Sequence, residues 1–543
     1  MPQVVPDRLK YSIKAPAVTS INKLGTFPAD GTDTYDGNTS NVLRFTIPHS
    51  ASDDFVDPTM SRIRIRMQLL IRDSDADNWT LSDGERYDLE AICLDRGIES
   101  IIRRLEIKDV SGNLLESIDH YNCLYAVTEL CTGVPEVRRT RGRFTFECLT
   151  KEDYEWGTEL WPPTLYQTIE GLTLQARTYE LSFNLFSGVF GGTCEKYWPL
   201  KPINGLVIEL QLENPVDCLR YKYGFNTQTT RNNFPRTNNI DNIPSEVLGR
   251  PVNPAHTPAQ RLDDAVAGWD AVITVNNYPV AGRQVWSPIT YNPELTAAAA
   301  EKISYKIYKP VIQLNRITVH NGVGSEIIEA GKRMSPDGRL RIQTHSWKVL
   351  STQILASATN FNYIIPIKVS SLKALFFTIT PDHCVGNINR SKTQFIQRGL
   401  RNYQFYYGME PVLASPIRVE YPNTEAFQEL MRAWNISHKT MDAPTMIKQK
   451  DYNQDSIRND FGWIQNPNSC VFGLDLESFA SKNNVMDSGV NTRHTNLSID
   501  LNFDPMSVRD LREWGSSCTI RFYCMHDMFI SINDIDGTVT NEY

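Results

Sequence analysis

Alternating hydrophobic and polar residues run through most of the chain. In residues 62–72 an apolar side chain occupies every second position from Ile63 to Leu69, and arginines stand between them. A period of two predicts a strand with one buried face. The same pattern predicts strands at 41–48, 100–118, 177–186, 205–214, 271–276, 303–319, 338–350, 361–369, 372–380, 415–421, 469–479, 496–504 and 517–533. Many short strands joined by polar turns predict antiparallel sandwiches, and therefore an all-β protein.

Only a few segments depart from this pattern. Residues 119–131, 292–302 and 424–434 carry apolar residues at helical spacing and predict short amphipathic helices. Within 100–118, Ser111-Gly112-Asn113 predicts the turn of a hairpin, because Gly and Asn tolerate positive φ.

Two distant strands carry the same residue pattern. Residues 206–213 and 497–504 both read Leu, any residue, Ile, acid, Leu, amide, apolar residue, acid. Each follows a strand and then a Ser-Gly-Val triplet, at 187–189 and at 488–490. Recurrence of several features in the same order predicts that one architecture is repeated.

A second pair of matches, at 43–45 and 340–342, has a similar spacing. We therefore expect one sandwich built twice. The first 40 residues lack a core pattern and predict an arm, whereas residues 224–260 are rich in Asn, Thr and Pro and predict a long exposed excursion.

The overall charge argues against a dedicated nucleic-acid-binding protein. Asp and Glu number 63 and Lys and Arg number 55, a formal net charge of −8, whereas phosphate-binding proteins are usually basic. The first residues lack the apolar run of a signal peptide, and no stretch is apolar enough to span a bilayer. We expect a protein made inside a cell, not secreted through a signal peptide, with no sequence-specific nucleic acid partner.

No motif for catalysis or cofactor binding stands out. The chain has no Walker A, nucleophile-elbow or HExxH motif. Asp73 begins a run like a calcium loop, but Asn78 stands where that loop needs Gly and Gly84 where it needs Glu. The ten cysteines include no CxxC pair and predict buried free thiols. We therefore expect no enzyme, with no catalytic, cofactor-binding or metal-binding residue.

Two charged stretches are candidates for a functional site. Residues 474–492 hold acids, a serine and a glycine. Asp475 and Glu477 alternate with leucines, which predicts that both face outward from a strand, and Gly489 is predicted to return the chain toward the next strand. The basic run 136–144 is predicted to be a solvated or interface loop, because the chain is acidic overall.

Four stretches together are similar to one family. They are 182–200 (a strand, a glycine turn and Trp-Pro-Leu), 305–319, the block 473–503 and the closing segment 522–543. In these stretches, and in their order over most of residues 40–543, the chain resembles the double jelly-roll major capsid proteins of tailless icosahedral double-stranded DNA viruses. The similarity is greatest to virophage and polinton-like viruses within the hexon-like lineage.

The resemblance implies two tandem eight-stranded jelly rolls (a double jelly roll) with a few short helices and long loop insertions. It implies an N-terminal arm at 1–40, a first jelly roll at 41–320 with insertions at about 134–177 and 224–300, and a second jelly roll at 321–543. It further implies a homotrimer with a pseudo-hexagonal outline that tiles the virion shell, with minor capsid and penton proteins as partners. Contact with an internal membrane stays open.

A carbohydrate-binding or carbohydrate-cleaving β-sandwich protein is the alternative. Such a protein needs surface aromatics over a groove and, for cleavage, two carboxylates close in space. A trimeric viral spike is a third class, but it need not repeat itself internally. Mass in solution discriminates the first two, because a capsid building block is a stable trimer and a glycan-binding monomer is not.

Overall fold

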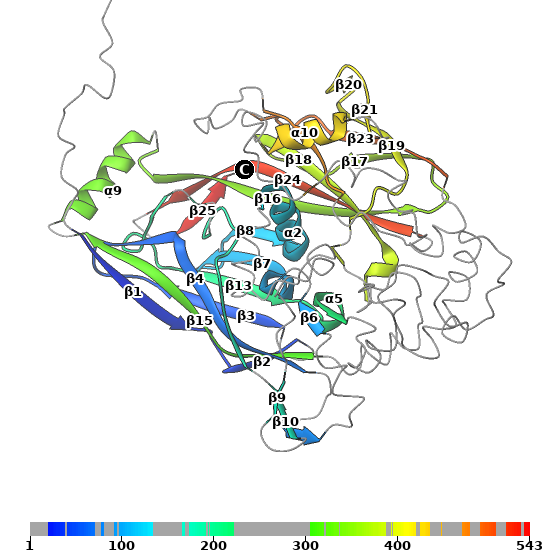
Figure 1. Ribbon diagram of the computed structural model, residues 1–543. Coiled ribbons are helices and arrows are strands. Elements are labelled where there is room, and N and C mark those ends of the chain that lie inside the picture. Colours follow the sequence, from blue (N-terminus) through cyan, green and yellow to red (C-terminus); the bar gives the residue numbers. More distant parts are fainter. Residues whose placement is uncertain are drawn as a thin grey trace, which may run out of the picture.

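The computed structural model describes residues 20–37, 41–70, 78–80, 92–94, 97–133, 166–168, 173–176, 178–191, 194, 196–221, 304–319, 322–335, 337–386, 392–393, 395–419, 424–434, 447, 470–477, 489–505, 517–533 and 537–542. Strands dominate these residues, in two sandwiches that lie side by side (Figure 1). The expected strand at 271–276, the expected helix at 292–302 and the whole of 224–300 fall outside the described residues.

Eight strands of the first half form two antiparallel sheets around a shared apolar core. Sheet A has the order β1-β15-β4-β11, and sheet B has the order β3-β13-β7-β8. Their bounds are β1 Ser20–Pro28, β3 Val42–Pro48, β4 Asp54–Leu70, β7 Ile102–Asp109, β8 Leu114–Asp119, β11 Tyr179–Phe183, β13 Gly205–Leu212 and β15 Ser304–Val319. Counted along the chain, the orders are 1-8-3-6 and 2-7-4-5, which is a jelly roll.

The second half repeats this order strand for strand. Sheet E has the order β16-β24-β18-β22, and sheet F has the order β17-β23-β19 with β20 and β21 both beside β19. Their bounds are β16 Leu340–Leu355, β17 Asn360–Ile365, β18 Leu372–Pro381, β19 Leu400–Tyr407, β20 Glu410–Pro411, β21 Ile417–Arg418, β22 Phe472–Asp475, β23 Leu497–Phe503 and β24 Ser517–Ile532. With β20 and β21 sharing the fifth place, the orders are again 1-8-3-6 and 2-7-4-5. The expected double jelly roll is confirmed.

Short strands and helices complete the described chain. Strands β2 Thr34–Asp36 and β12 Trp198–Pro199 extend sheet A, and β25 Val539–Glu542 extends sheet E. Sheet C holds β5 Asn78–Thr80, β9 Tyr166–Thr168 and β10 Thr173–Ala176, and sheet D holds β6 Ile92–Leu94 and β14 Leu219–Tyr221. The helices are η3 Ile98–Ile101, α2 Tyr121–Thr132, α5 Pro215–Cys218, α9 Val323–Met334, η5 Asp382–Cys384 and α10 Glu425–Ala433. Among the residues described, no helix is both long and apolar enough to cross a membrane.

Of the two sequence matches between the halves, one aligns equivalent strands of the two sandwiches and the other does not. The 206–213 and 497–504 patterns fall on β13 and β23, each the seventh strand of its sandwich. The 43–45 and 340–342 match was wrong, because it pairs a second strand, β3, with a first strand, β16. Three-residue alternating patterns recur in any β protein, so this match reflected the strand period and not descent from one repeat.

The helices extend the repeat. The expected helices at 119–131 and 424–434 are confirmed as α2 and α10, and each lies between the fifth and sixth strands of its sandwich. Helix α9, which connects the two sandwiches, was not expected. Gly324 and Gly331 lie inside it, and glycine lowers the intrinsic helix propensity of this segment.

The expected arm at 1–40 includes a structural strand. Strand β1 pairs with β15 over nine residues, from Ser20 opposite Val319 to Pro28 opposite Val311. Most of β1 is exposed, because it is an edge strand, so the alternation that marks other strands is missing. Residues 1–19 of the expected arm lie outside the described residues.

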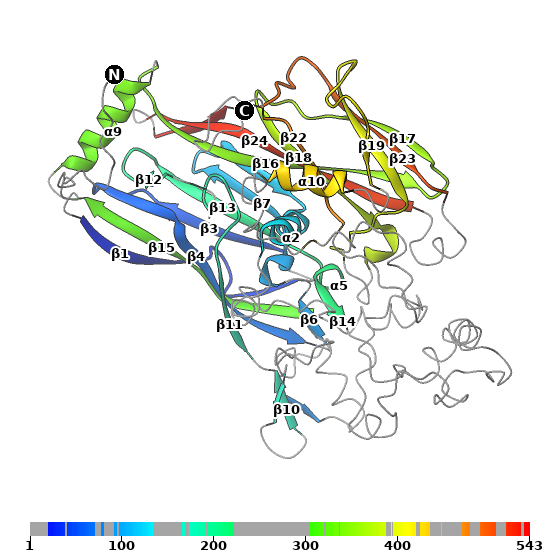
Figure 2. The ribbon, with the colours of Figure 1, turned by 45° about the horizontal axis from the view of Figure 1, so that its top comes forward.

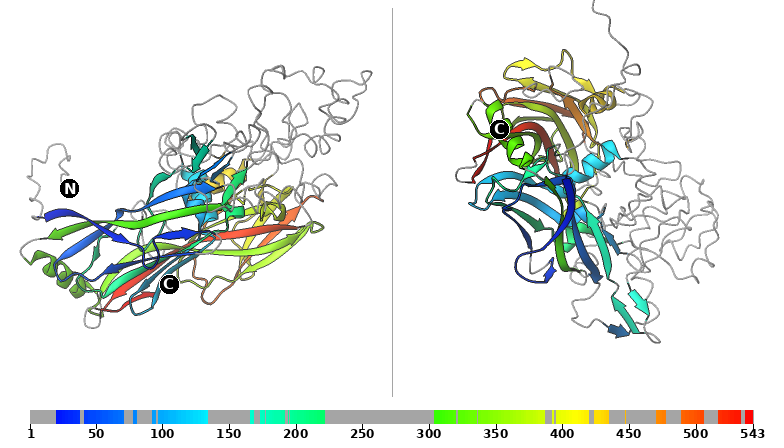
Figure 3. Two further views of the ribbon diagram at one scale, coloured as in Figure 1. Left: turned by 90° about the horizontal axis from the view of Figure 1, so that it is seen from below. Right: turned by 90° about the vertical axis from the view of Figure 1, so that its left-hand side faces the viewer.

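Side-chain packing follows the sequence pattern elsewhere. In β4 the residues Ile63, Ile65, Met67 and Leu69 are at most 2% exposed, and the intervening arginines point away from the core. The eight cysteines whose side chains are described are buried, as expected. Figure 2 shows α2 between the two sandwiches, and Figure 3 shows that their long strands run in roughly the same direction.

Candidate functional site: the junction between the two jelly rolls

The first jelly roll reaches the second through the turn after β11. The hydroxyl of Thr344 in β16 donates to the carbonyl of Gly188 at 2.5 Å. A Cβ atom added at Gly188 would lie 1.6 Å from the carbonyl oxygen of His345. No side chain fits at that distance, so the Ser-Gly-Val triplet of the first half is a contact point between the sandwiches.

The corresponding glycine of the second half makes a similar approach inside its own sandwich. A Cβ atom at Gly489 would lie 2.4 Å from the carbonyl oxygen of Leu372, and Val490 bridges Leu372. Residues 478–488 lie outside the described residues, so the expected return at Gly489 stays a prediction. The two triplets therefore hold equivalent positions in the chain, but only the first one joins the sandwiches.

Glu116 lies at the centre of this contact and is fully buried. Ser346 of the second jelly roll donates its hydroxyl to Glu116 Oε1 at 2.6 Å. From the first jelly roll, Ser187 donates its hydroxyl and Gly188 its backbone N–H, the latter at 3.2 Å. Burial raises the pKa of the Glu116 carboxyl, and these donors oppose that rise. One carboxyl thus ties groups of both sandwiches together.

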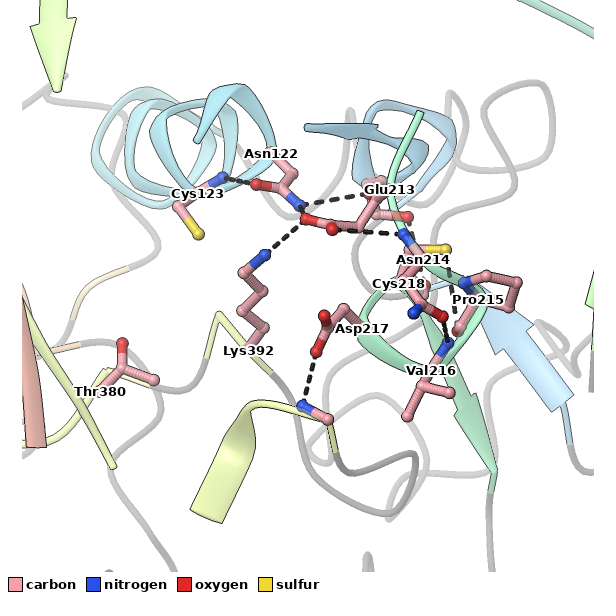
Figure 4. A network of polar contacts seen from close by, with 12 residues as sticks. Asn122, Cys123, Glu213, Asn214, Pro215, Val216, Asp217, Cys218, Thr380 and Lys392 are labelled. Carbon is pink, nitrogen blue, oxygen red and sulfur yellow. Dashed lines mark hydrogen bonds and ion pairs between the residues drawn. The ribbon is translucent and has the colours of Figure 1, made fainter. Parts of the chain in front are cut away.

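A buried ion pair forms a second tie (Figure 4). Lys392, which follows η5, places its Nζ 2.5 Å from Oε2 of Glu213 at the end of β13. The amide of Asn122 in α2 donates to the same carboxylate at 2.9 Å. Burial opposes the charge on Glu213, but the Lys392 ammonium and the amide donors outweigh it and lower the pKa of the carboxyl. Burial likewise opposes the charge on Lys392, and neighbouring groups including Glu213 raise its pKa.

The final strand adds a third set of ties. The Asn541 side chain in β25 donates to the carbonyl of Leu115 at 2.6 Å, and the Val539 N–H donates to Asp109 at 3.3 Å. Strand β25 pairs with β24 of sheet E. It therefore hydrogen-bonds to both sandwiches at once.

Aromatic side chains fill the apolar part of the junction. The ring of Phe186, next to Ser187, lies 6.0 Å from Trp347 in β16. Trp347 in turn lies 5.9 Å from Phe376 and 5.7 Å from Trp434. Such pairs contribute packing and quadrupole attraction, each about 0.5–1.5 kcal/mol beyond area burial.

The acids singled out at 474–492 were expected to face outward from a strand, and both Asp475 and Glu477 are partly buried. Asp475 lies 3.4 Å from Arg432 of α10. Glu477 lies past the end of β22, and its carboxylate is 3.0 Å from Nζ of Lys373, which is itself 3.3 Å from Asp527. Helix α10 and strand β18 flank this segment, which is why outward-facing positions of a strand become partly buried ion pairs.

The polar and aromatic contacts described above hold the two sandwiches together. No group of three or more His, Cys, Asp or Glu suited to a metal ion occurs in this part of the chain. The Asp73 run and the basic run 136–144 lie outside the described residues. Nothing in the sequence marked Glu116, Glu213 or Lys392, because each acts through a partner on a distant strand or loop.

No protein-family model matches the sequence, and neither does any curated protein. Solved structures match it along its whole length. A chain of the Sputnik virophage structure has 11% identity and a TM-score of 0.56, over 100% of this chain and 93% of that chain. The mavirus major capsid protein matches at 8% identity and a TM-score of 0.48 (100% and 95% covered), and the PBCV-1 virus capsid at 9% and 0.48 (98% and 99% covered).

At 11% identity the Sputnik match bears on the fold alone. The strand order, which was established without it, points to the same fold. The protein therefore has the double jelly-roll fold of virophage major capsid proteins.

Proposed function

We propose that this chain is the major capsid protein of an icosahedral virus and that it forms pseudo-hexagonal homotrimers that tile the virion shell. The observation that carries the proposal is the repeated strand order, 1-8-3-6 and 2-7-4-5 twice in one chain. Three copies of a chain with two similar sandwiches present six similar units around a threefold axis. Such a trimer can be surrounded by six neighbours in the shell, although it is built from one kind of chain. The proposal assigns the protein no catalytic activity.

We assign the parts of the chain to this role as follows. The first jelly roll runs from β1 to β15, the second from β16 to β25, and α9 connects them. Residues 1–19 are the arm that ties neighbouring trimers or minor capsid proteins. The insertions at 134–177 and 224–300 supply the outward tower and part of the trimer contact.

Assembly follows from the relative strength of interfaces. Large, apolar trimer interfaces form first inside the host cell, and smaller, more polar contacts between trimers then add reversibly. Penton and minor capsid proteins complete the shell. The net charge of −8 suits a shell that does not itself coat the genome.

Light scattering on the purified protein, followed by negative-stain images of the same peak, tests the proposal. We expect a particle of three times 61.9 kDa with a hexagonal outline. A stable monomer of 61.9 kDa would contradict the proposal and favour the carbohydrate-binding alternative, which glycan-binding assays would then test.

Deletion of residues 1–19 tests the arm. We expect trimers to persist and shells to fail, because β1 begins at Ser20 and stays intact. A deletion of 1–35 is the comparison, and it should also weaken the fold because it removes β1 from sheet A. Intact shells from the shorter deletion would refute the role of the arm.

A further inference from the structure

Helix α9 packs on both jelly rolls through its smallest residues. A Cβ atom added at Gly324 would lie 2.6 Å from the Cβ of Asp53, which precedes β4. A Cβ atom added at Gly331 would lie 2.7 Å from the side chain of Leu340, the first residue of β16. Ile328 lies on the same side of the helix and is 7% exposed. The inner side of α9 is therefore made largely of glycine.

A polar contact fixes the beginning of α9. The carboxylate of Asp53 accepts the Ser325 N–H at 3.3 Å and the Ser325 hydroxyl at 3.0 Å. Lys201 places its Nζ 2.7 Å from the same carboxylate and lowers the pKa of Asp53. A negative charge at this end also complements the helix dipole. These contacts and the glycine packing set which side of the helix turns outward.

The outward side of α9 carries an apolar stripe. Val323, Ile327, Ala330 and Met334 stand at i, i+4, i+7 and i+11 and share one side of the helix. We call these four residues the α9 stripe. Ile327 is 49% exposed and Met334 is 87% exposed. A surface helix normally turns such a stripe to the core, so its outward direction indicates that another segment covers it.

Charged residues border the α9 stripe at its two ends. Glu326 stands near its beginning and Arg333 near its end, and both are exposed. Glu329 is already paired with Lys332 at 2.8 Å. Within the described part of the chain, neither Glu326 nor Arg333 has an ion-pair partner. An acid is thus available at the beginning of the stripe and a base at its end.

The chain enters β1 beside the beginning of α9. Ser20, the first residue of β1, pairs with Val319, the last residue of β15. The Val319 N–H donates to the carbonyl of Asp53 at 3.1 Å, and the Asp53 side chain holds the first turn of α9. Figures 1 and 2 show α9 at the end of the sandwiches where β1 begins and β15 ends. The residues just before Ser20 are therefore tethered next to the α9 stripe.

The sequence before β1 has a pattern that complements the stripe. Leu9, Tyr11 and Ile13 alternate with Lys10 and Ser12. In an extended segment every second side chain lies on one side, so the three apolar side chains would share a face. That face is about 13 Å long, close to the length of about 10 Å between the two exposed side chains of the stripe.

We propose that residues 7–14 lie across the α9 stripe of the same chain. Because the chain enters β1 beside the beginning of α9, the segment runs from the end of the helix towards its beginning. This direction places Leu9 at the end of the stripe and Ile13 at its beginning. The Tyr11 ring then covers the small residue between the two exposed side chains.

The charges agree with this direction. Lys14 reaches Glu326 at the beginning of the stripe, and Asp7, the only acid before β1, reaches Arg333 at its end. The reverse direction would set like charges against each other. A short tether also gives this segment a higher effective concentration at the stripe than the same segment of another copy. The contact belongs to one chain and does not depend on the proposed trimer, and it leaves residues 1–6 to reach a neighbour.

Limited trypsin digestion of the full chain tests the contact, because 7–14 contains three basic residues. The variant Ile327→Ser/Met334→Ser removes the large side chains of the stripe, and both are exposed, so the fold should persist in thermal unfolding. We expect cleavage within 7–14 to become about tenfold faster, with the sites located by mass spectrometry. The matched control Ile364→Ser/Met409→Ser changes side chains that are 56% and 98% exposed on the second jelly roll, and it should keep the wild-type rate. Equal rates in all three proteins, or a rise in the control as well, would overturn the proposal.

Cysteine pairs test the direction and the copy. Under oxidation by glutathione disulfide, Leu9→Cys/Met334→Cys should form a disulfide bond within one chain of 61.9 kDa, as read by non-reducing electrophoresis and peptide mapping. The mismatched pair Ile13→Cys/Met334→Cys should form it about tenfold more slowly, because its thiols are held apart. Equal rates for the two pairs would overturn the proposal. A product of two chains would place the segment on a neighbouring copy and would overturn it as well.

Discussion

The ion pair between Glu213 and Lys392 permits a quantitative test of the junction. Their side chains are 3% and 7% exposed, and the charged atoms are 2.5 Å apart. At an effective dielectric constant of 20, that separation corresponds to an attraction of about 7 kcal/mol. Desolvation of both ions offsets most of this attraction, so the intact pair adds little net stability.

When one partner is removed, the buried charge of the other partner is no longer compensated, and its desolvation cost lowers the free energy of unfolding. In Lys392→Met, Glu213 stays buried with only amide donors, from Asn122 and from its own neighbour Asn214. We expect the free energy of unfolding to fall by about 3–5 kcal/mol. The double variant Lys392→Met/Glu213→Gln removes both charges and keeps an acceptor for Asn122, so its loss should be only about 1 kcal/mol.

Urea unfolding followed by tryptophan fluorescence measures these changes, because Trp347 and Trp434 lie at the junction. Limited proteolysis across the same urea range reports whether the sandwiches separate before either one unfolds. The single variants Lys392→Met and Glu213→Gln and the double variant form a double-mutant cycle. Its coupling free energy should be at least about 2 kcal/mol. Additive single and double variants, with no coupling, would refute the claim that this pair is a desolvated link between the jelly rolls.

Three further changes test other parts of the junction. Gly188→Ala should lower the free energy of unfolding by more than about 2 kcal/mol, because its Cβ overlaps the His345 carbonyl, whereas Gly331→Ala in α9 should cost far less in thermal unfolding. Burial lowers the pKa of His526 from 6.5 to about 4, so the neutral side chain is favoured in the folded protein. Its contribution to stability is present above pH 6.5, and about 3 kcal/mol of it is lost as the pH falls to 4. In urea titrations at several pH values, a His526→Gln variant should show a smaller dependence of stability on pH. Asn541→Ala removes the bond to Leu115 and should speed proteolytic separation of the sandwiches, while Asn360→Ala, on exposed β17, should not.

The alternation of side chains predicted the sandwich strands other than β1, β19 and β20. It is clear in a long strand with one buried face, as in β4, where every second residue enters the core, and it is interrupted in β19, where the register shifts between Leu400 and Asn402. The repeat was detectable because β13 and β23 are central strands of their sheets and keep the same inward and outward residues. Strand β1 escaped prediction because an exposed edge strand has no apolar period.

The junction could not be predicted in the same way. Ser346 and Glu116 lie 230 residues apart in sequence, and Lys392 and Glu213 lie 179 residues apart. A buried polar residue on a strand looks locally like a solvent-facing one, since both occupy the polar phase of the alternation. Only the arrangement of the two sandwiches decides that Glu116 is buried and that Arg64 is not.

The strand order has a consequence for how the protein is made. In sheet A the eighth sandwich strand, β15, lies between β1 and β4, and in sheet E the eighth sandwich strand, β24, lies between β16 and β18. During synthesis the earlier strands therefore wait with open edges until the middle strand leaves the ribosome, and such edges recruit other chains. Pairings as distant as Ser20 with Val319 also give a high contact order and slow folding. We expect poor recovery when concentrated protein is refolded from denaturant, and higher recovery when chaperones are supplied or nascent chains are kept dilute.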